Sequence, residues 1–193
     1  MARRIFFSFH YQDVIDFRAN VVRQHWVTKP DRQLAGFFDA SVWESAQKTG
    51  DLALKRLING ALERTTGTCI LVGTETYKRR WVKYEIFKSL ERNNGLIAVH
   101  INKIKGKDQK TKSNGQNPLE YLGIKVSEDG KTVTPVEYDG WFTWNNSNDL
   151  APFTLTTPMA YRFWNKRVSL NELFPTYCWI DNDGYNNFTN WVN

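Results

Sequence analysis

The segment Gly73-Thr-Glu-Thr-Tyr-Lys-Arg-Arg-Trp-Val-Lys-Tyr-Glu-Ile-Phe87 joins an apolar run to an amphipathic helix. The run before it, Thr68-Cys-Ile-Leu-Val72, is short and lies between two glycines, as expected for a central parallel strand covered on both faces. Apolar residues recur at four-residue spacing from Val82 to Leu90, which predicts one buried helix face. Glu85 on this helix is therefore expected near the carboxyl end of the strand, where open α/β sheets bind ligands.

Strands and helices alternate on both sides of this segment. Before the segment we predict a strand at Arg4–Phe9 and a helix capped by Asp13, with apolar positions Val14, Phe17, Val21 and Trp26. A short strand at Gly36–Asp39 and a loop at Ala40–Ser45 follow, and then a helix with apolar positions Leu52, Leu54, Leu57, Ile58 and Leu62. After the segment we predict a buried strand at Leu96–Ile101. Such alternation implies right-handed crossovers and a parallel sheet with helices on both faces. We predict an α/β fold with strand order 2-1-3-4 and any fifth strand beside the fourth (2-1-3-4-5).

The pattern weakens beyond residue 102. The length of 193 residues suits a single domain, residues 1–193, with a core of about residues 1–102 and a C-terminal β and loop embellishment of about residues 103–193. Lys131–Tyr138 predicts an edge strand, because Pro135 lacks the N–H that a central strand requires. The final segment is rich in aromatic residues and asparagine, and we expect it to wrap the sheet as loops and short helices.

The chain is basic, with a formal net charge of +6 and a pI near 9.3, so nucleic acid, an acidic membrane surface and a dinucleotide are all candidate partners. Its densest basic run is interleaved with small and polar residues rather than with aromatic ones. This run consists of Lys103, Lys105, Lys107, Lys110 and Lys112. Such runs are usually solvated loops, so we expect neither a nucleic-acid nor a membrane partner.

The cysteines and the N-terminal segment favour a reducing, cytoplasmic setting. Cys69 lies in the predicted central strand and Cys178 is far along the chain, so they do not make a disulfide framework. The first apolar segment is broken at Ser8 and His10, far short of a signal peptide, and no run is long enough to span a bilayer. The histidines and cysteines lack metal-ligand spacing, so we expect no metal.

The simplest interpretation of Glu85 is a surface ion pair with Lys88. Its position favours another interpretation, because the exits of parallel neighbouring strands share one edge of the sheet. Residues of the first strand that reach this edge are Phe6, Ser8, His10 and Tyr11. Phe6 and Phe7 point to opposite faces of the strand, so one can be core while the other leans toward a pocket.

Two motifs resemble those of Toll/interleukin receptor (TIR) domains. Phe7-Ser-Phe-His-Tyr-Gln-Asp13 is similar to their first-strand motif, and Trp81-Val-Lys-Tyr-Glu85 is similar to their Trp-x-x-x-Glu helix motif. The chain more closely resembles the TIR-like proteins of the bacterial Thoeris antiphage system, over essentially its whole length. The further matching segments are Trp26–Thr28, Phe38–Ser41, Ala53–Gly60, Asn117–Pro118, Tyr121–Gly123, Asp149–Pro152 and Asp183–Asn186.

The resemblance implies a flavodoxin-like fold and an enzyme that breaks the nicotinamide-ribose bond of NAD. The remainder would close into a cyclic ADP-ribose isomer with a ribose-to-ribose link, a messenger that activates a separate NAD-consuming effector after a phage-derived trigger is sensed. NAD is then the substrate, and no cofactor is needed. Glu85 would be the catalytic residue. The resemblance implies that Phe6, Asp39, Ser41, Thr74 and Thr76 bind the substrate. From their positions near the strand exits we also expect substrate contacts from Ser8, His10, Tyr11 and Trp81.

The chemistry accounts for a single carboxylate. An ordinary glycosidase needs a second carboxyl group to protonate its leaving group, whereas nicotinamide leaves as a neutral pyridine. One anion can accept hydrogen bonds from the ribose hydroxyls and stabilise the developing oxocarbenium ion. Aromatic residues near the site would supply stacking and exclude water, and the candidates are Phe6, Tyr11, Trp43 and Trp81.

Other interpretations of the same pattern remain open. A phosphoacceptor receiver domain shares the topology, but it needs an acidic pair after the first strand and an aspartate at the end of the central one, where Ser8 and Gly73 stand. A non-catalytic TIR adaptor that works through domain contacts is the main alternative, because a fold does not determine a function. A nucleic-acid binder would show steeply salt-dependent binding, and the sequence contains no motif for it.

Overall fold

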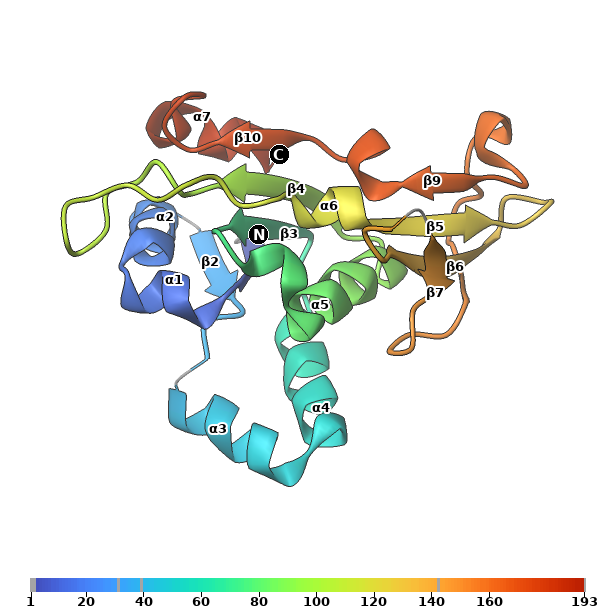
Figure 1. Ribbon diagram of the computed structural model, residues 1–193, viewed down its shortest axis with the longest axis horizontal. Coiled ribbons are helices and arrows are strands. Elements are labelled where there is room, and N and C mark those ends of the chain that lie inside the picture. Colours follow the sequence, from blue (N-terminus) through green and yellow to red (C-terminus); the bar gives the residue numbers. More distant parts are fainter. Residues whose placement is uncertain (1–2, 31, 39, 142, 193) are drawn as a thin grey trace.

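A parallel sheet of five strands forms the centre of the computed structural model, which describes residues 3–30, 32–38, 40–141 and 143–192. The strands are β1 (Arg3–Phe9), β2 (Arg32–Ala35), β3 (Gly67–Val72), β4 (Gly95–His100) and β10 (Thr176–Cys178). They lie in the order β10-β4-β3-β1-β2, and every neighbouring pair is parallel (Figure 1). The predicted α/β class and strand order are confirmed, with the fifth strand beside the fourth.

Helices cover both faces of this sheet. The covering helices are α1 (Tyr11–Ile15), α2 (Arg18–Val27), α4 (Asp51–Leu62), α5 (Arg80–Glu91) and α7 (Gly184–Trp191). A further helix, α3 (Ala40–Thr49), packs on α4. On one face α2 and α7 bury Trp26 and Phe188 against Phe7. On the other face α4 buries Ile58 and Leu62 against Phe6, so the two phenylalanines of β1 lie on opposite faces, as predicted.

A second, antiparallel sheet extends the core beyond α5 (Figure 1). Its strands are β5 (Leu122–Val126), β6 (Thr132–Tyr138), β7 (Trp144–Asn146) and β9 (Arg167–Ser169) in the order β7-β6-β5-β9, with β8 (Phe153–Thr154) also paired to β6. A short helix, α6 (Pro118–Tyr121), leads into β5. Ile124 and Val133 of this sheet join one hydrophobic cluster with Ile86 of α5 and Ile70 of β3. The two sheets therefore share a core.

The predicted boundary at about residue 102 does not describe the central sheet, because β10 and α7 both come from the end of the chain. The final segment contains short strands as well as loops and helices, which the weak periodicity did not reveal. Its strands are only two or three residues long, so they carry little alternation for a sequence pattern to show. That the whole chain is one domain stays a prediction.

The strand around Pro135 was predicted at an edge, but β6 lies inside the second sheet. The carbonyl oxygen of Pro135 accepts a hydrogen bond from the Ser147 N–H at 2.9 Å, on the β7 side. In an extended residue the N and the carbonyl point to the same side, so the position without an N–H also faces that side. On that side of β6, Pro135 lies between the residues that pair with β8 and the residues that pair with β7. The missing N–H therefore removes no hydrogen bond between strands.

The second strand lies earlier than predicted, at Arg32–Ala35 instead of Gly36–Asp39. Gly36 ends the strand, because its φ is +90° and a Cβ at this position would lie 2.2 Å from the carbonyl oxygen of Phe7. Asp39 lies outside the described residues. The apolar residues that suggested a strand therefore belong to the connection that follows β2.

The predicted loop at Ala40–Ser45 is instead the first part of α3. This helix makes its main packing contact with α4 and projects with it from the sheet (Figure 1). Its exposed side chains include Val42 and Gln47, so it lacks the broad apolar face that identifies a core helix. Gly50, with φ of +113°, makes the turn from α3 to α4.

The first helix is interrupted, which the sequence did not predict. His10, not Asp13, is the N-cap of α1, and Asp13 lies inside the helix with only 3% of its surface exposed. Phe17 adopts a left-handed conformation (φ 67°) that ends α1 and starts α2, and its side chain is 51% exposed. The buried face of α2 is formed by Arg18, Ala19, Val22 and Trp26.

The basic loop, residues 103–116, is fixed to the rest of the molecule although its lysine side chains are exposed as expected. The guanidinium of Arg18, 1% exposed, donates hydrogen bonds to the carbonyl oxygens of Ile104 (3.0 Å) and Lys110 (2.7 Å). Gly115 packs so closely on Gly73 that a Cβ would lie 1.9 Å from its carbonyl oxygen. The loop therefore covers the exit of β3. No helix in the described part of the chain has the length and apolar character that crossing a bilayer requires.

Replacing Arg18 should release this loop. In Arg18→Met two carbonyl groups lose a buried charged donor, so we expect the free energy of unfolding to fall by about 2–3 kcal/mol. We also expect trypsin to cleave after the loop lysines much faster than in wild type. Urea unfolding and timed proteolysis measure both effects, with Arg92→Met, at an exposed position, as control. A proteolysis rate equal to that of wild type would show that Arg18 does not hold the loop.

Candidate active site

The carboxyl group of Glu85 is buried at the junction of α5 and β1. The residue is only 6% exposed, and its Oε2 accepts a hydrogen bond of 2.6 Å from the hydroxyl of Ser8, which is fully buried. Lys88 forms its ion pair with Glu91 instead. Glu85 is therefore not the surface ion-pair residue of the simplest sequence interpretation.

Burial sets the protonation state of Glu85. Removal from water raises the pKa of this carboxyl from 4.5 to about 8, and the hydrogen bond from Ser8, which favours the anion, opposes the rise. Among the described residues no cation is near enough to pair with it, and the acid form is therefore favoured at neutral pH. Such a strongly perturbed group in a cavity is typical of catalytic sites.

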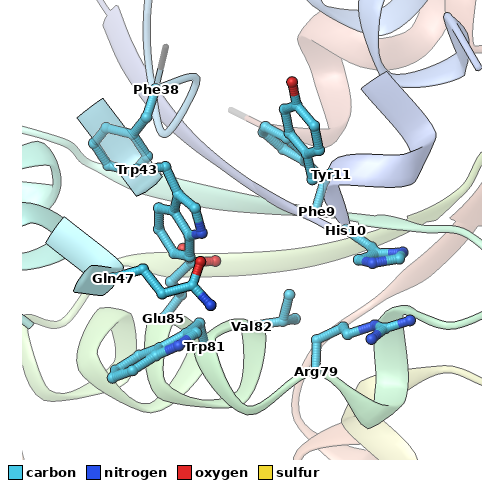
Figure 2. Close-up of a pocket in the computed structure, with 10 residues that line it drawn as sticks. All are labelled: Phe9, His10, Tyr11, Phe38, Trp43, Gln47, Arg79, Trp81, Val82 and Glu85. Carbon is cyan, nitrogen blue, oxygen red and sulfur yellow. The ribbon is translucent and has the colours of Figure 1, made fainter. Parts of the chain in front are cut away.

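Glu85 faces a cavity of about 290 Å³ at the carboxyl ends of β1 and β2 (Figure 2). The lining residues come from the exit of β1, from the segment before α3, from α3 and from the start of α5. They are Phe9, His10, Tyr11, Phe38, Trp43, Gln47, Arg79, Trp81, Val82 and Glu85. Rings thus surround the carboxyl on several sides, while polar atoms reach the cavity from only a few positions.

The indole of Trp81 is fixed by its neighbour in sequence. The guanidinium of Arg80 stacks on this ring at 4.7 Å and is itself held by both carboxylate oxygens of Asp149, at 2.7 and 2.8 Å, and by Asp51 at 2.6 Å. Lys55 also pairs with Asp149, at 3.1 Å. These hydrogen bonds lower the pKa of Asp149 to about 2, with Arg80 as the main cause. The wall of the cavity is thus tied to the segment between β7 and β8.

Several residues that the sequence assigned to the site do meet here. His10, Tyr11, Trp81 and Glu85 line the cavity, and Ser8 reaches it through its hydrogen bond to Glu85. They meet because β1 runs parallel to β3 and α5 crosses back over β1. Trp43, which the sequence suggested as a possible aromatic wall, also lines the cavity.

Phe6 does not reach the cavity. It is fully buried and packs with Ala35, Ile58, Leu62 and Tyr84 in the core beneath Ser8. Phe6 and Ser8 lie two residues apart on the same face of β1, so the serine stands between Phe6 and the strand exit. The structure gives Phe6 a packing position, and Phe9 is the phenylalanine of β1 that lines the cavity.

Two predicted threonines serve the backbone around the end of β3. The hydroxyl of Thr76, fully buried in the short helix at Thr76–Lys78, accepts from the Gly73 N–H at 2.9 Å. The Thr74 hydroxyl lies 3.3 Å from the carbonyl oxygen of Ser113, in the basic loop. Neither threonine lines the cavity.

The remaining predicted position on α3 also faces away. Ser41 is exposed and borders a groove between α3 and α4 instead. Asp39 lies outside the described residues, so its predicted role stays a prediction.

Part of the lining was not predicted from the sequence, namely Phe9, Phe38, Gln47, Arg79 and Val82. The signal for Gln47 was its spacing of four residues from Trp43, which places both on one helix face once α3 is recognised as a helix. Arg79 directly precedes α5, and its nearness to Trp81 was a usable signal. Phe38 stacks on Trp43 at 5.8 Å, a contact between the connection after β2 and α3 that no sequence pattern records.

The described residues contain no group of three or more histidine, cysteine, aspartate or glutamate side chains that could hold a metal ion. His10 has a lowered pKa, first because of burial and then because of the Arg79 guanidinium, so its imidazole is neutral at neutral pH. The site therefore offers one buried carboxyl, a neutral imidazole and a guanidinium around a space lined by rings. This set can bind a ligand with aromatic groups and both charge signs.

Two comparisons with known proteins indicate the family of the chain. Residues 6–106 match the family model described as Thoeris protein ThsB, TIR-like domain. A curated protein of Bacillus cereus (strain MSX-D12), named "Putative cyclic ADP-D-ribose synthase ThsB1", is 52% identical over 193 residues, which span 100% of both chains. The matched family region contains the second half of β1, from Phe6, and all of α5 with Glu85.

The buried carboxyl should make the wild type less stable as the pH rises. Between the ordinary pKa of 4.5 and the folded pKa of about 8, the folded state keeps a proton that the unfolded state releases. The free energy of unfolding therefore falls by up to about 1.4 kcal/mol per pH unit in this window. Glu85→Gln removes this term, so its stability relative to wild type should increase from pH 5 to pH 8.

Urea unfolding at both pH values measures this difference, with Glu63→Gln, an exposed position, as control. A constant difference between Glu85→Gln and wild type at the two pH values would contradict a raised pKa at Glu85.

Proposed function

The chain belongs to the family of Thoeris ThsB proteins with a TIR-like domain, and on this premise we propose that it cleaves NAD at the nicotinamide-ribose bond and cyclises the ADP-ribose portion. The observation that carries the proposal is the buried Glu85 carboxyl in a cavity lined by rings. The name of the Bacillus cereus relative supports a cyclic ADP-ribose as the product. NAD is the substrate in this reaction, and the site residues supply the chemistry without a metal or a cofactor.

The charge of the substrate suits this carboxyl. In NAD the nicotinamide ring is a pyridinium cation, and a nearby positive charge lowers the pKa of a carboxyl group. Binding of NAD would therefore convert Glu85 from the acid to the carboxylate with release of a proton. A neutral ligand would not lower the pKa of Glu85 in this way, so the buried carboxyl favours a cationic substrate.

The bond-breaking step needs only this one anion. The electron pair of the C–N bond leaves with nicotinamide, which becomes a neutral pyridine and requires no proton. Positive charge then develops on the ribose, and the Glu85 carboxylate stabilises it by charge and by hydrogen bonds to the ribose hydroxyls. The rings around the carboxyl exclude water, which strengthens this interaction.

Cyclisation follows when a hydroxyl of the adenosine ribose attacks the same carbon in place of water. The new C–O bond forms as the hydroxyl loses its proton, and Glu85 is the acceptor because its pKa in the unliganded site is about 8. We propose the ribose-to-ribose isomer as the product, since the two sugars are held close when water is excluded.

Family membership also suggests the biological setting. In a Thoeris antiphage system the cyclic product would act as a messenger that activates a separate NAD-consuming effector, and a phage-derived component would trigger synthesis. We place the reaction in the cytoplasm, where NAD is available.

A non-catalytic TIR adaptor is the alternative, and the geometry disfavours it. An adaptor acts through its surface and has no use for a carboxyl that is only 6% exposed. Burying such a group opposes folding, so an apolar residue would serve a purely structural role better.

Glu85→Gln should strongly reduce turnover. The amide keeps the shape of the carboxyl but cannot carry the negative charge, so we expect nicotinamide release to fall by a factor of about a hundred or more, as for loss of an oxyanion-hole donor. Release of nicotinamide and formation of cyclic product are measured by chromatography with mass spectrometry, in the presence of the phage trigger. A variant that makes product at the wild-type rate would remove Glu85 from the mechanism, and absence of product from triggered wild type would favour the adaptor.

The reaction should also show a pH dependence that reports Glu85. Because the free enzyme must lose the Glu85 proton, kcat/KM should rise about tenfold per pH unit up to about pH 8 and then level off. Ser8→Ala removes the hydrogen bond that favours the anion, so the plateau should move to higher pH and the loss of activity should be larger at pH 7 than at pH 9. A profile unchanged by Ser8→Ala would contradict the assignment of this pKa to Glu85.

A further inference from the structure

One end of the cavity is cationic and the other is aromatic. Trp43, Gln47 and Trp81 surround Glu85 at one end, and the side chains of His10 and Arg79 lie together at the other (Figure 2). Burial and the Ser8 hydroxyl act on the pKa of Glu85, whereas Arg79 acts on that of His10. The guanidinium is therefore next to the imidazole and is not a counter-ion of the buried carboxyl.

Arg79 differs from the basic residues beside it. Lys78 pairs with Glu75 at 3.1 Å, and Arg80 is held by Asp149 and Asp51. Within the described ranges, the Arg79 guanidinium has no hydrogen bond, ion pair or ring contact of its own. Although Glu75 is close enough to raise the pKa of His10, it is already paired with Lys78. An arginine that lines a cavity without a protein partner is available to a ligand.

The spacing between Arg79 and Glu85 suits a dinucleotide. Arg79 is the N-cap of α5 and stands six residues before Glu85, which corresponds to roughly 9 Å along the helix axis. In NAD the carbon that bears nicotinamide is one ribose and a 5′-oxygen away from the first phosphorus. A ribose whose reacting carbon lies at Glu85 would therefore place its pyrophosphate near the opposite end of the cavity.

We propose that Arg79, with His10, binds the pyrophosphate of the dinucleotide substrate. The planar guanidinium can donate two parallel hydrogen bonds to phosphate oxygens, and the neutral imidazole can donate one more. The inference rests on the proposed function for the identity of the ligand, but binding to Arg79 requires no reaction. With the pyrophosphate fixed there, the nicotinamide lies among the rings near Trp43 and Trp81, and the adenosine half must turn back toward Glu85 before the ring can close.

A direct binding measurement tests this site without turnover. ADP carries the pyrophosphate but no nicotinamide, and adenosine lacks both, so the two are titrated by calorimetry into wild type, Arg79→Ala and Arg79→Gln. We expect ADP to bind about ten to a hundred times more weakly to both variants, because a charged hydrogen-bond donor is lost, while adenosine binding stays within about twofold. Arg92→Ala, at an exposed position beyond the far end of α5, should bind ADP like wild type.

The outcomes separate this inference from the proposed function. If Arg79→Ala and Arg79→Gln bind ADP like wild type, or if wild type does not bind millimolar ADP, the pyrophosphate site is wrong whether or not NAD is cleaved. If ADP binding depends on Arg79 but triggered wild type releases no nicotinamide, the site stands and the proposed reaction fails. Melting temperatures close to that of wild type are expected for the variants, because Arg79 is exposed.

Discussion

The burial of one carboxyl group, that of Glu85, is the constraint around which the rest of the structure is arranged. Parallel pairing places Ser8 beside Ile70 in β3, and the chain returns over β1 in α5, so a hydroxyl and a carboxyl meet in the interior at 2.6 Å. Within the described part of the chain, this is the one hydrogen bond that offsets the lost hydration of the carboxyl, and the pKa of Glu85 rises accordingly. A fold selected for stability alone would favour an apolar residue here. The carboxyl is understandable as a group kept out of water for chemistry.

The helices and strands that could be predicted from the sequence are those whose buried faces produce a regular pattern of apolar residues. β3 and β4 are continuous apolar runs, and α4 and α5 repeat apolar residues at helical spacing, so each was located within a few residues. β2 was misplaced because it is a four-residue edge strand with little apolar signal, next to the strongly apolar pair Phe37 and Phe38. β10 could not be located, because its pairing with β4 joins segments far apart in the chain. No local pattern records such a contact.

The site was predictable where it depends on strand exits. Ser8, His10 and Tyr11 follow from the exit of β1, and Glu85 from the helix after β3. A hydroxyl near a strand end can equally well bond to its own backbone turn, as Thr76 does, and sequence spacing does not distinguish the two roles. Trp43 was a candidate from its ring alone, but the contribution of Gln47 was hidden because the α3 segment was interpreted as a loop. The family resemblance led to the prediction of the reaction, but it did not predict which residues line the cavity.

The projection of α3 from the sheet means that ligand selectivity and folding are largely separate problems for this protein. Trp43 and Gln47 line the cavity from a helix that packs mainly on α4, between two glycines with positive φ, Gly36 and Gly50. Substitutions at the exposed positions of this helix, such as Gln47, change the free energy of unfolding little, usually by no more than about 0.5 kcal/mol. Over evolutionary time this wall can diversify toward other nucleotides while the buried carboxyl and its strands stay the same.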